Sequence, residues 1–215
     1  MTKLVLPDRP QLPDDVVRGT FERLVRADEH CVGELLLRDC KVRVLAVRGY
    51  FRRTMGDPTK NDVGIVDDAA FVITPKAIGR FNMNTDPSRL GINRENGKHM
   101  AVLAPGVWPY KRGTHRGEPG HIRQPHDEDA GWMALPTYFG DERALGEFTV
   151  LRDGVPDVGD FGINHHSAST RSTSSAGCQT WPPSQWTEYR DMVYRALDDA
   201  GQAWLPYVLT AETLA

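Results

Sequence analysis

One cysteine and two adjacent histidines lie close together in the last quarter of the sequence. His165 and His166 precede Cys178, with a loop rich in serine and threonine between them. A thiol attacks a carbonyl as its thiolate, so a catalytic cysteine needs a base or a cation nearby, and an imidazole can be that base near neutral pH. We interpret Cys178 as a nucleophile activated by a histidine of this segment. Ordinary packing of a lone cysteine, with two surface histidines, is the competing interpretation.

The residue before the cysteine favours the catalytic interpretation. Gly177 has no Cβ, so its backbone can approach a substrate closely and can direct N–H groups toward a developing oxyanion. The short hydroxyl side chains of residues 169–175 can hydrogen-bond the backbone of a turn and hold it in shape.

The order of these motifs resembles the catalytic domain of the L,D-transpeptidases, the YkuD-like family. Its signature is a histidine, a variable loop and then Ser/Thr-x-Gly-Cys, and the matching segments here are Ile163-Asn164-His165-His166-Ser167 and Ser175-Ala176-Gly177-Cys178. The resemblance is greatest to divergent phage and prophage members and spans about residues 40–200. It also includes Gly177-Cys178-Gln179-Thr180-Trp181-Pro182-Pro183, the run from Asn82 to Ser88, and Pro105-Gly106-Val107-Trp108-Pro109-Tyr110-Lys111.

The resemblance implies a role for several residues. Cys178 is expected to be the nucleophile and His166 the base, with oxyanion amides from Gly177 and Cys178, while Ser175 orients the histidine or the substrate. We expect the substrate contacts to come from His165, Ser167, Lys111 and Tyr110, although an exposed lysine and a core tyrosine also fit the sequence. Ala176 and Thr180 depart from the family pattern, which leaves open whether an amine or water accepts the acyl group.

The resemblance also implies an activity. The substrate is expected to be a peptidoglycan stem peptide, attacked at an L,D bond through a Cys178 thioester, without a cofactor or a metal. We expect a lysis enzyme of a phage or prophage, an endolysin. The alternatives are a secreted antibacterial toxin of the same chemistry, a non-catalytic wall-binding module, and a zinc peptidase that uses His115, His121 and His126 with the acidic residues 127–129.

Composition and charge narrow the class of protein. The formal net charge is −3 and basic residues are dispersed, so we expect no nucleic-acid partner. No stretch is apolar for long enough to insert in a membrane, and the first residues do not form a secretory signal. We therefore expect synthesis in the cytoplasm and release to the cell wall in the periplasm; the oligomeric state stays open. Cys31 and Cys40 are expected to be small buried side chains, and a disulfide between them is not required.

The elements that must position these residues indicate an α+β fold, mostly β, with a YkuD-like sandwich or barrel-like core and a few peripheral helices. We expect a tail over residues 1–13 and one domain over 14–215. Apolar spacing predicts helices over about 14–28 and from 183 to a cap at Gly201. Strands are expected at one or two places within 34–55 and at 69–73, 99–103, 107–111 and 148–152, with an extended 161–166. Residues 82–97 and 112–130 read as loops, the second as a lid over the cleft.

Overall fold

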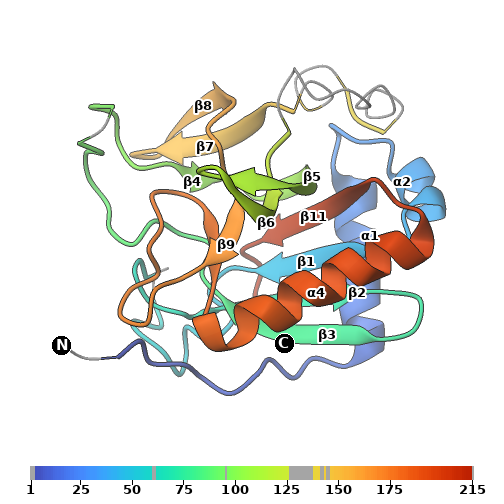
Figure 1. The fold of residues 1–215 in the computed structure, drawn as a ribbon, viewed down its shortest axis with the longest axis horizontal. Helices are drawn as coiled ribbons and strands as arrows, with labels where there is room; N and C mark the ends of the chain where they lie inside the picture. Colours follow the sequence, from blue (N-terminus) through green and yellow to red (C-terminus); the bar gives the residue numbers. More distant parts are fainter. Residues whose placement is uncertain are drawn as a thin grey trace.

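The fold is mostly β, with helices placed on two sides of a large sheet (Figure 1). The computed structural model describes residues 3–59, 62–94, 96–125, 138–140, 143 and 146–214. Within these residues the helices are α1 (Asp14–Ala27), α2 (Gly33–Asp39) and α4 (Pro183–Ala200).

The large sheet has eight strands in the order β10-β9-β6-β5-β11-β1-β2-β3. In chain order these are β1 (Arg43–Val47), β2 (Asp68–Ile73), β3 (Ile78–Met83), β5 (Gly106–His115), β6 (Glu118–Arg123), β9 (His165–Ser167), β10 (Gln179–Trp181) and β11 (Trp204–Thr210). A bridge between Asn84, just after β3, and Thr180 of β10 joins its two edges through backbone hydrogen bonds of 2.8 and 2.9 Å. The sheet is therefore nearly closed and barrel-like, as the fold class predicted from the sequence requires.

A second, three-stranded sheet lies beside the first. It consists of β4 (Val102–Leu103), β7 (Phe148–Arg152) and β8 (Val155–Gly159), in the order β4-β7-β8. Leu103, Phe148 and Val150 are fully buried and join the core that also holds the aromatic face of α4.

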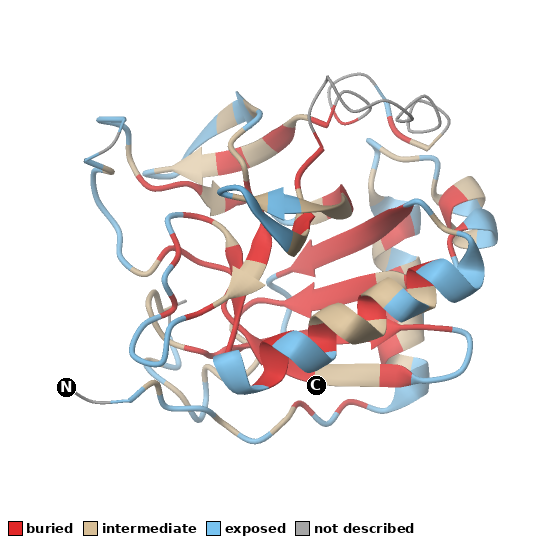
Figure 2. Cartoon of the chain, in the orientation of Figure 1, coloured by how far each residue is buried: buried red, intermediate tan, exposed pale blue. Residues whose placement is uncertain are grey.

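The central strands are buried on both faces, because successive side chains point to opposite sides of a strand. On β1, Val44 and Ala46 enter one hydrophobic core, whereas Leu45 and Val47 enter another. The first core lies under α4 and the small sheet, and the second lies under α1 and α2. Figure 2 shows the resulting band of buried residues along β11, β1 and β2.

Helix α4 begins and ends where the sequence indicates. Pro183 occupies its first turn, where a missing N–H is harmless, and Gly201 caps the end in the left-handed conformation with φ 59°. Its buried face carries Trp186, Tyr189 and Val193, so the predicted amphipathic helix is confirmed. Helix α1 likewise confirms the prediction for about 14–28.

Two predicted segments differ from the structure. Residues 34–39 belong to helix α2, not to a strand; Leu36 is fully buried in the second core and the adjacent Leu37 packs against the same core. The first half of the expected loop 112–130 is the β5–β6 hairpin, which turns at Arg116 (φ 51°) and Gly117 (φ 82°). Two consecutive residues with positive φ match the twist of a two-residue hairpin. Of the expected lid over 112–130, residues 112–125 are described, and His126, Asp127, Glu128 and Asp129 lie outside the described residues.

The N-terminal residues lie along the body of the protein. The amide of Leu4 donates to the carbonyl of Thr170, Arg9 pairs with Glu188 of α4, and Leu12 is buried in the second core. Among the described residues, no helix has the length and apolar character that a bilayer crossing requires.

Candidate active site

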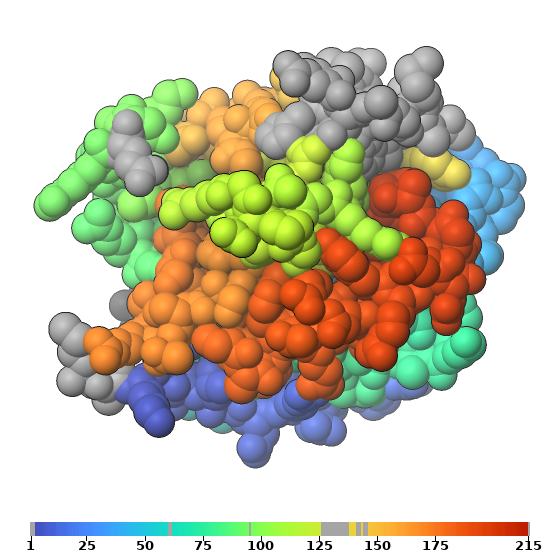
Figure 3. All heavy atoms as spheres, in the orientation of Figure 1, coloured from blue at the N-terminus to red at the C-terminus, as the bar shows by residue number. Residues whose placement is uncertain are grey.

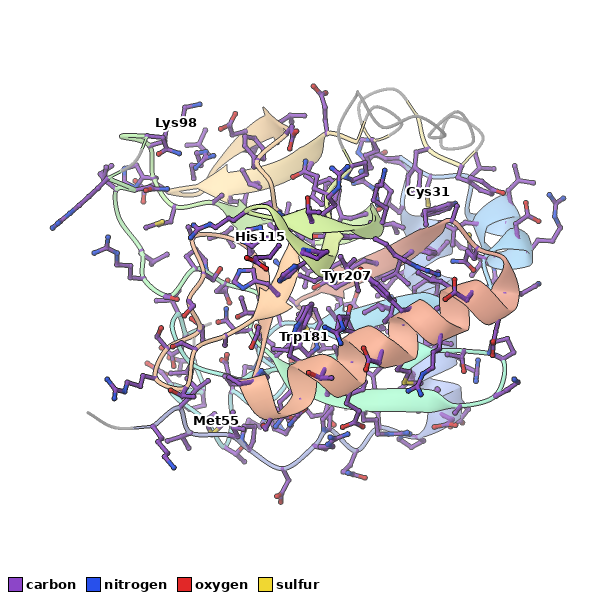
Figure 4. The ribbon with its side chains drawn as sticks, viewed as in Figure 1. Cys31, Met55, Lys98, His115, Trp181 and Tyr207 are labelled. Atoms are coloured by element: carbon purple, nitrogen blue, oxygen red, sulfur yellow. The ribbon has the colours of Figure 1, made fainter. Side chains whose placement is uncertain are left out.

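Cys178 and two histidines form a cluster at one end of the large sheet. The sulfur of Cys178 and one ring nitrogen each of His166 and His115 all lie within 4.8 Å of one another. The two imidazoles stack with 4.8 Å between ring centroids and an interplanar angle of 6°. All three residues are partly buried, neither fully exposed nor in the closed core. Figure 4 shows His115 beside β9, the strand that carries His165 and His166.

Strand register explains why these residues meet. Strands β9 and β10 are parallel, with His165 opposite Gln179 and His166 opposite Thr180. Cys178 immediately precedes β10 and therefore lies beside Asn164, which immediately precedes β9. His115 ends β5, and its hairpin partner β6 pairs with β9 at Ile122 and His165. Figure 3 shows this hairpin, residues 160–177 and α4 on one face of the molecule.

The thiol of Cys178 lies against the backbone of residues 162–164. Its sulfur lies 3.4 Å from the carbonyl oxygen of Gly162 and 3.5 Å from the backbone nitrogen of Asn164. Burial raises the pKa of the Cys178 thiol, while the Asn164 N–H and the positive charge of Arg116 act in the opposite direction. The resting side chain is therefore a neutral thiol at neutral pH, and it needs a base to become a nucleophile.

A backbone hydrogen bond fixes the tautomer of His166. Its Nδ1 lies 2.9 Å from the carbonyl oxygen of Ser167, and a carbonyl can only accept, so Nδ1 carries the proton. The Nε2 lone pair is then free to take a proton. Burial lowers the pKa of His166, which keeps the ring neutral and able to act as a base at neutral pH.

Asn164 fixes His115 in the other tautomer. The amide N–H of Gln124 donates to Asn164 Oδ1 at 3.0 Å, so Asn164 must present its NH₂ group to His115 Nδ1 at 2.8 Å. His115 Nδ1 is therefore an acceptor, and in the neutral ring Nε2 carries the proton. Burial, followed by the neighbouring His166, His121 and Arg116, lowers the pKa of His115 to about 4. His115 thus stays neutral, and its lone pair is already taken.

Ser175 and Gly177 shape the turn that presents Cys178. Ser175 Oγ donates to the Cys178 carbonyl at 2.7 Å and accepts the Gly177 N–H at 2.9 Å. Gly177 has φ 148°, and a Cβ there would lie 2.6 Å from the carbonyl oxygen of Ala101. The expected oxyanion amide of Gly177 is therefore wrong, because Ser175 already takes it. Ser175 orients this turn, without a hydrogen bond to the histidine.

The Cys178 amide is the better oxyanion donor. Among the residues that the structure describes, its N–H makes no hydrogen bond except toward its own sulfur. An N–H on the nucleophile itself is well placed for the oxygen of a tetrahedral intermediate.

The segment after β3 is hydrogen-bonded to the turn that precedes Cys178. Ser88 exchanges hydrogen bonds with Ser175 through its backbone N–H and its hydroxyl, both at 2.8 Å, and its hydroxyl lies 2.7 Å from Thr173 Oγ1. Thr85 accepts from the side chain of Gln179. The Asn82–Ser88 run therefore supports the turn, a task that the sequence alone did not assign to it.

Two expected substrate contacts are wrong. His165 and Tyr110 are fully buried, and their rings pack against each other with centroids 4.1 Å apart. His165 Nδ1 also meets the hydroxyl of Tyr189 at 2.9 Å. Because neighbouring residues of a strand point to opposite faces, His166 faces the site and His165 faces the core.

Two further substrate contacts stay predictions. Ser167 is half-buried, and its hydroxyl donates to the Ala168 carbonyl. Lys111 lies on β5, four residues before His115 and thus roughly 13 Å away along the strand.

Sequence reasoning did not connect three residues with Cys178. His115 and Arg116 were placed in a polar loop, with His115 expected only as a zinc ligand beside His121 and His126, and Asn164 was noted only as part of a motif. The signal for the first two was the Arg116-Gly117 pair between two runs of extended sequence, which is typical of a tight hairpin. The imidazole of His121 lies 5.7 Å from that of His115, but the rest of the expected zinc cluster is outside the described residues.

The other cysteines differ from Cys178 in their surroundings. Cys40 is buried, Cys31 is half-buried, and neither forms a disulfide. Burial raises the pKa of each of these thiols to about 12, so both stay protonated at neutral pH. Neither Cys31 nor Cys40 belongs to the Cys178 cluster.

Comparisons of the chain with models of protein families, with curated proteins and with solved structures find no match. The likeness to the L,D-transpeptidases stays an expectation based on motifs.

Proposed function

We propose that this protein is a cysteine acyl-transfer enzyme in which Cys178 is the nucleophile and His166 its base. One observation carries the proposal: a ring nitrogen of His166 lies within 4.8 Å of the Cys178 sulfur, and the Ser167 carbonyl takes the Nδ1 proton of that neutral imidazole, which leaves Nε2 as the acceptor. A nucleophile, a base and a group that orients the base form the usual arrangement of covalent catalysis. Here the orienting group is the carbonyl of Ser167.

The first step forms a thioester. The sulfur attacks an amide carbonyl while His166 Nε2 takes the thiol proton, and the Cys178 N–H stabilises the oxyanion. Collapse of the intermediate breaks the C–N bond, and His166 returns the proton to the leaving amine. Because the thiol and the imidazole are both neutral at rest, the proton transfer takes place during attack.

The second step releases the acyl group. Water or a second amine attacks the thioester carbonyl, His166 accepts the proton of the attacking group, and the thiol leaves with that proton. Water gives hydrolysis and an amine gives transpeptidation. His115, neutral and stacked on His166, limits the motion of the base through its bond to Asn164.

The motifs around Cys178 supply the proposed substrate. Their similarity to the L,D-transpeptidases favours a peptidoglycan stem peptide, with attack at the bond that follows its third residue. A role in lysis of a bacterial host by a phage or prophage is the proposed context.

The test is mass spectrometry of purified muropeptides incubated with the reduced protein. We expect loss of a terminal residue or a new cross-link, and an acyl adduct on Cys178 after brief exposure. Cys178→Ala should abolish turnover, because no other thiol lies in the cluster. Reaction in H₂¹⁸O separates the two outcomes, since hydrolysis places the label in the product carboxylate and transpeptidation does not.

Matched variants decide whether the effect belongs to the site. Cys31→Ser and Cys40→Ser remove thiols that lie in or against the second core and should leave turnover unchanged. Turnover that persists in a folded Cys178→Ala protein would exclude the thioester mechanism. Binding of muropeptides without turnover in the natural chain would favour a wall-binding module instead.

A further inference from the structure

The donor atoms of the active-site cluster also suit a soft divalent metal ion. His115, His166 and Cys178 each offer one ligand atom, and the three atoms lie within 4.8 Å of one another. Two imidazole nitrogens and a thiolate sulfur are donors that zinc takes, whereas magnesium and calcium prefer oxygen. Three protein ligands and one position open to solvent is a common zinc arrangement. We propose that these three side chains bind one zinc ion.

Two of the three proposed ligands already have hydrogen bonds that favour metal binding. His166 donates from Nδ1 to the Ser167 carbonyl, and metal-binding histidines are commonly held by such a bond on the nitrogen away from the metal. The Cys178 sulfur receives the Asn164 N–H at 3.5 Å, a contact that favours negative charge on sulfur. Binding forms a zinc–sulfur bond and releases the thiol proton to solvent.

Asn164 controls the third ligand. It donates to His115 Nδ1, and its own Oδ1 is held by the Gln124 amide, so it offers no acceptor for a proton on Nδ1. His115 can ligate through Nδ1 only by giving up the Asn164 bond. It can ligate through Nε2 only after its proton has moved to Nδ1, where Asn164 does not accept it. Asn164 therefore sets the zinc affinity of the site without touching the ion.

Zinc binding has a direct consequence for the thiol. An ion on the Cys178 sulfur and on His166 removes the nucleophile and its base together, so the zinc-bound and thiol-active states exclude each other. This consequence rests on the proposed function, whereas the binding itself does not.

The probe is Co²⁺, titrated into the reduced natural chain and then displaced by Zn²⁺. We expect one ion per chain, with visible d–d bands and a near-ultraviolet sulfur-to-cobalt charge-transfer band. Cys178→Ser should lose the charge-transfer band, and His115→Gln should weaken binding about tenfold or more, the usual size of an effect on metal affinity. Cys31→Ser is the matched control and should bind as the natural chain does.

The Asn164→Asp variant is the sharpest test. A carboxylate keeps one oxygen for the Gln124 amide and gives the other to a proton on His115 Nδ1, which frees Nε2 for the metal. We expect Co²⁺ to bind at least about tenfold more tightly, as an added carboxylate–histidine bond typically provides. Absence of the charge-transfer band in the natural chain, or equal affinities in the natural chain and His115→Gln, would overturn the site.

Muropeptide turnover separates this inference from the proposed function. Turnover that zinc stops and a chelator restores supports both. The charge-transfer band without turnover, with or without zinc, supports the metal site and contradicts the proposed enzyme. Turnover that requires zinc supports the metal site and contradicts the thioester mechanism.

Discussion

At the scale of single residues, two imidazoles lie within reach of the Cys178 sulfur, and their hydrogen bonds separate their tasks. His166 has a free lone pair because Ser167 accepts its Nδ1 proton, whereas Asn164 occupies the lone pair of His115. Residue type and order in the sequence led us to propose Cys178 as the nucleophile and His166 as its base. The sequence named His115 only as a possible zinc ligand and could not place it beside Cys178, because His115 lies 49 positions before Asn164 and only the fold brings the two segments together.

The two histidines should differ when each is replaced by glutamine, which keeps hydrogen bonding but not basicity. His166→Gln should lower kcat for muropeptide turnover about 10²–10⁴-fold, the usual contribution of a general base. His115→Gln should cost much less, because the ring neither gives nor takes the proton. Steady-state kinetics on both folded variants measures this, and equal losses would show that the roles are wrongly assigned.

Gly177 is a residue at which even a methyl group is excluded. Gly177→Ala should lower the free energy of unfolding by about 1–3 kcal/mol, because the new Cβ would lie 2.6 Å from the Ala101 carbonyl oxygen. Urea denaturation measures the change. Gly159→Ala is the matched control, since Gly159 has a similar φ of 157° but its nearest atom is 3.5 Å away in the Phe161 ring. If both variants lose the same free energy, the backbone conformation and not the close contact is responsible.

At the scale of elements, the strands and helices with strong periodicity were predictable and the irregular ones were not. Helices α1 and α4 have apolar stripes and end signals, and both were predicted. Strands β3 and β8 were missed because their sequences include Gly79, Arg80, Pro156 and Asp157, which weaken a strand pattern. Their pairing with β2 and β7 supplies the stability that the local sequence lacks.

The Ser88 clamp is an element-scale device that connects the end of β3 with the catalytic turn. Ser88→Ala removes two hydroxyl contacts but keeps the backbone bond to Ser175. We expect a loss of about 1–2 kcal/mol of stability, the usual range for buried hydrogen bonds, and a lower kcat with little change in KM. Hydrogen exchange of the Ser175 amide should become faster.

Ser172→Ala serves as the control for that clamp. The Ser172 hydroxyl contacts only Ser169 and Ser174 in the exposed part of the same loop, so stability and kcat should stay near those of the natural chain. Unchanged exchange at Ser175 in Ser88→Ala would contradict the clamp.

At the scale of the whole molecule, two buried carboxyl groups connect the stability of the fold to pH. Burial, with the neighbouring acids Asp68, Asp86 and Asp62, raises the pKa of Asp67 to about 8. Burial and Asp86 raise the pKa of Asp68 to about 7, against the opposing effects of Gly49, Arg48 and Thr85. Asp67 immediately precedes β2 and Asp68 begins it. The Asp68 carboxyl accepts the backbone N–H of Gly49, which follows β1, and that of Thr85, which follows β3.

The direction of the pH effect follows from these shifts. The folded chain holds protons on Asp67 and Asp68 that the unfolded chain releases near pH 4, so their contribution is fully present below pH 4. It is lost as the pH rises through 7 and 8. We expect the Tm to fall by several °C between pH 5 and pH 8.5, since about 1 kcal/mol shifts a domain of this size by about 2–4 °C.

Asp67→Asn isolates this contribution, because an amide is neutral at every pH. The variant should melt at a higher temperature than the natural chain at pH 8.5 and should show a smaller slope of Tm against pH, measured by calorimetry. Asp157→Asn, at a partly exposed position, is the control and should keep the natural slope. An unchanged slope in Asp67→Asn would show that other groups set the pH dependence.

The position of β11 has a consequence for the rate at which the protein folds. This strand lies between β5 and β1. Residues 204–210 therefore join strands β10, β9, β6 and β5 on one side to strands β1, β2 and β3 on the other. Each strand that pairs with β11 is at least about 90 residues distant in the chain. The entropy of closing such a large loop is lost before the strand contacts contribute any stability, which slows folding. A chain that ends at Ala200 contains Cys178, His166 and His115, but it lacks the strand that joins the two parts of the sheet. We therefore expect slow, concerted refolding in which catalytic competence and native fluorescence return together in one late phase.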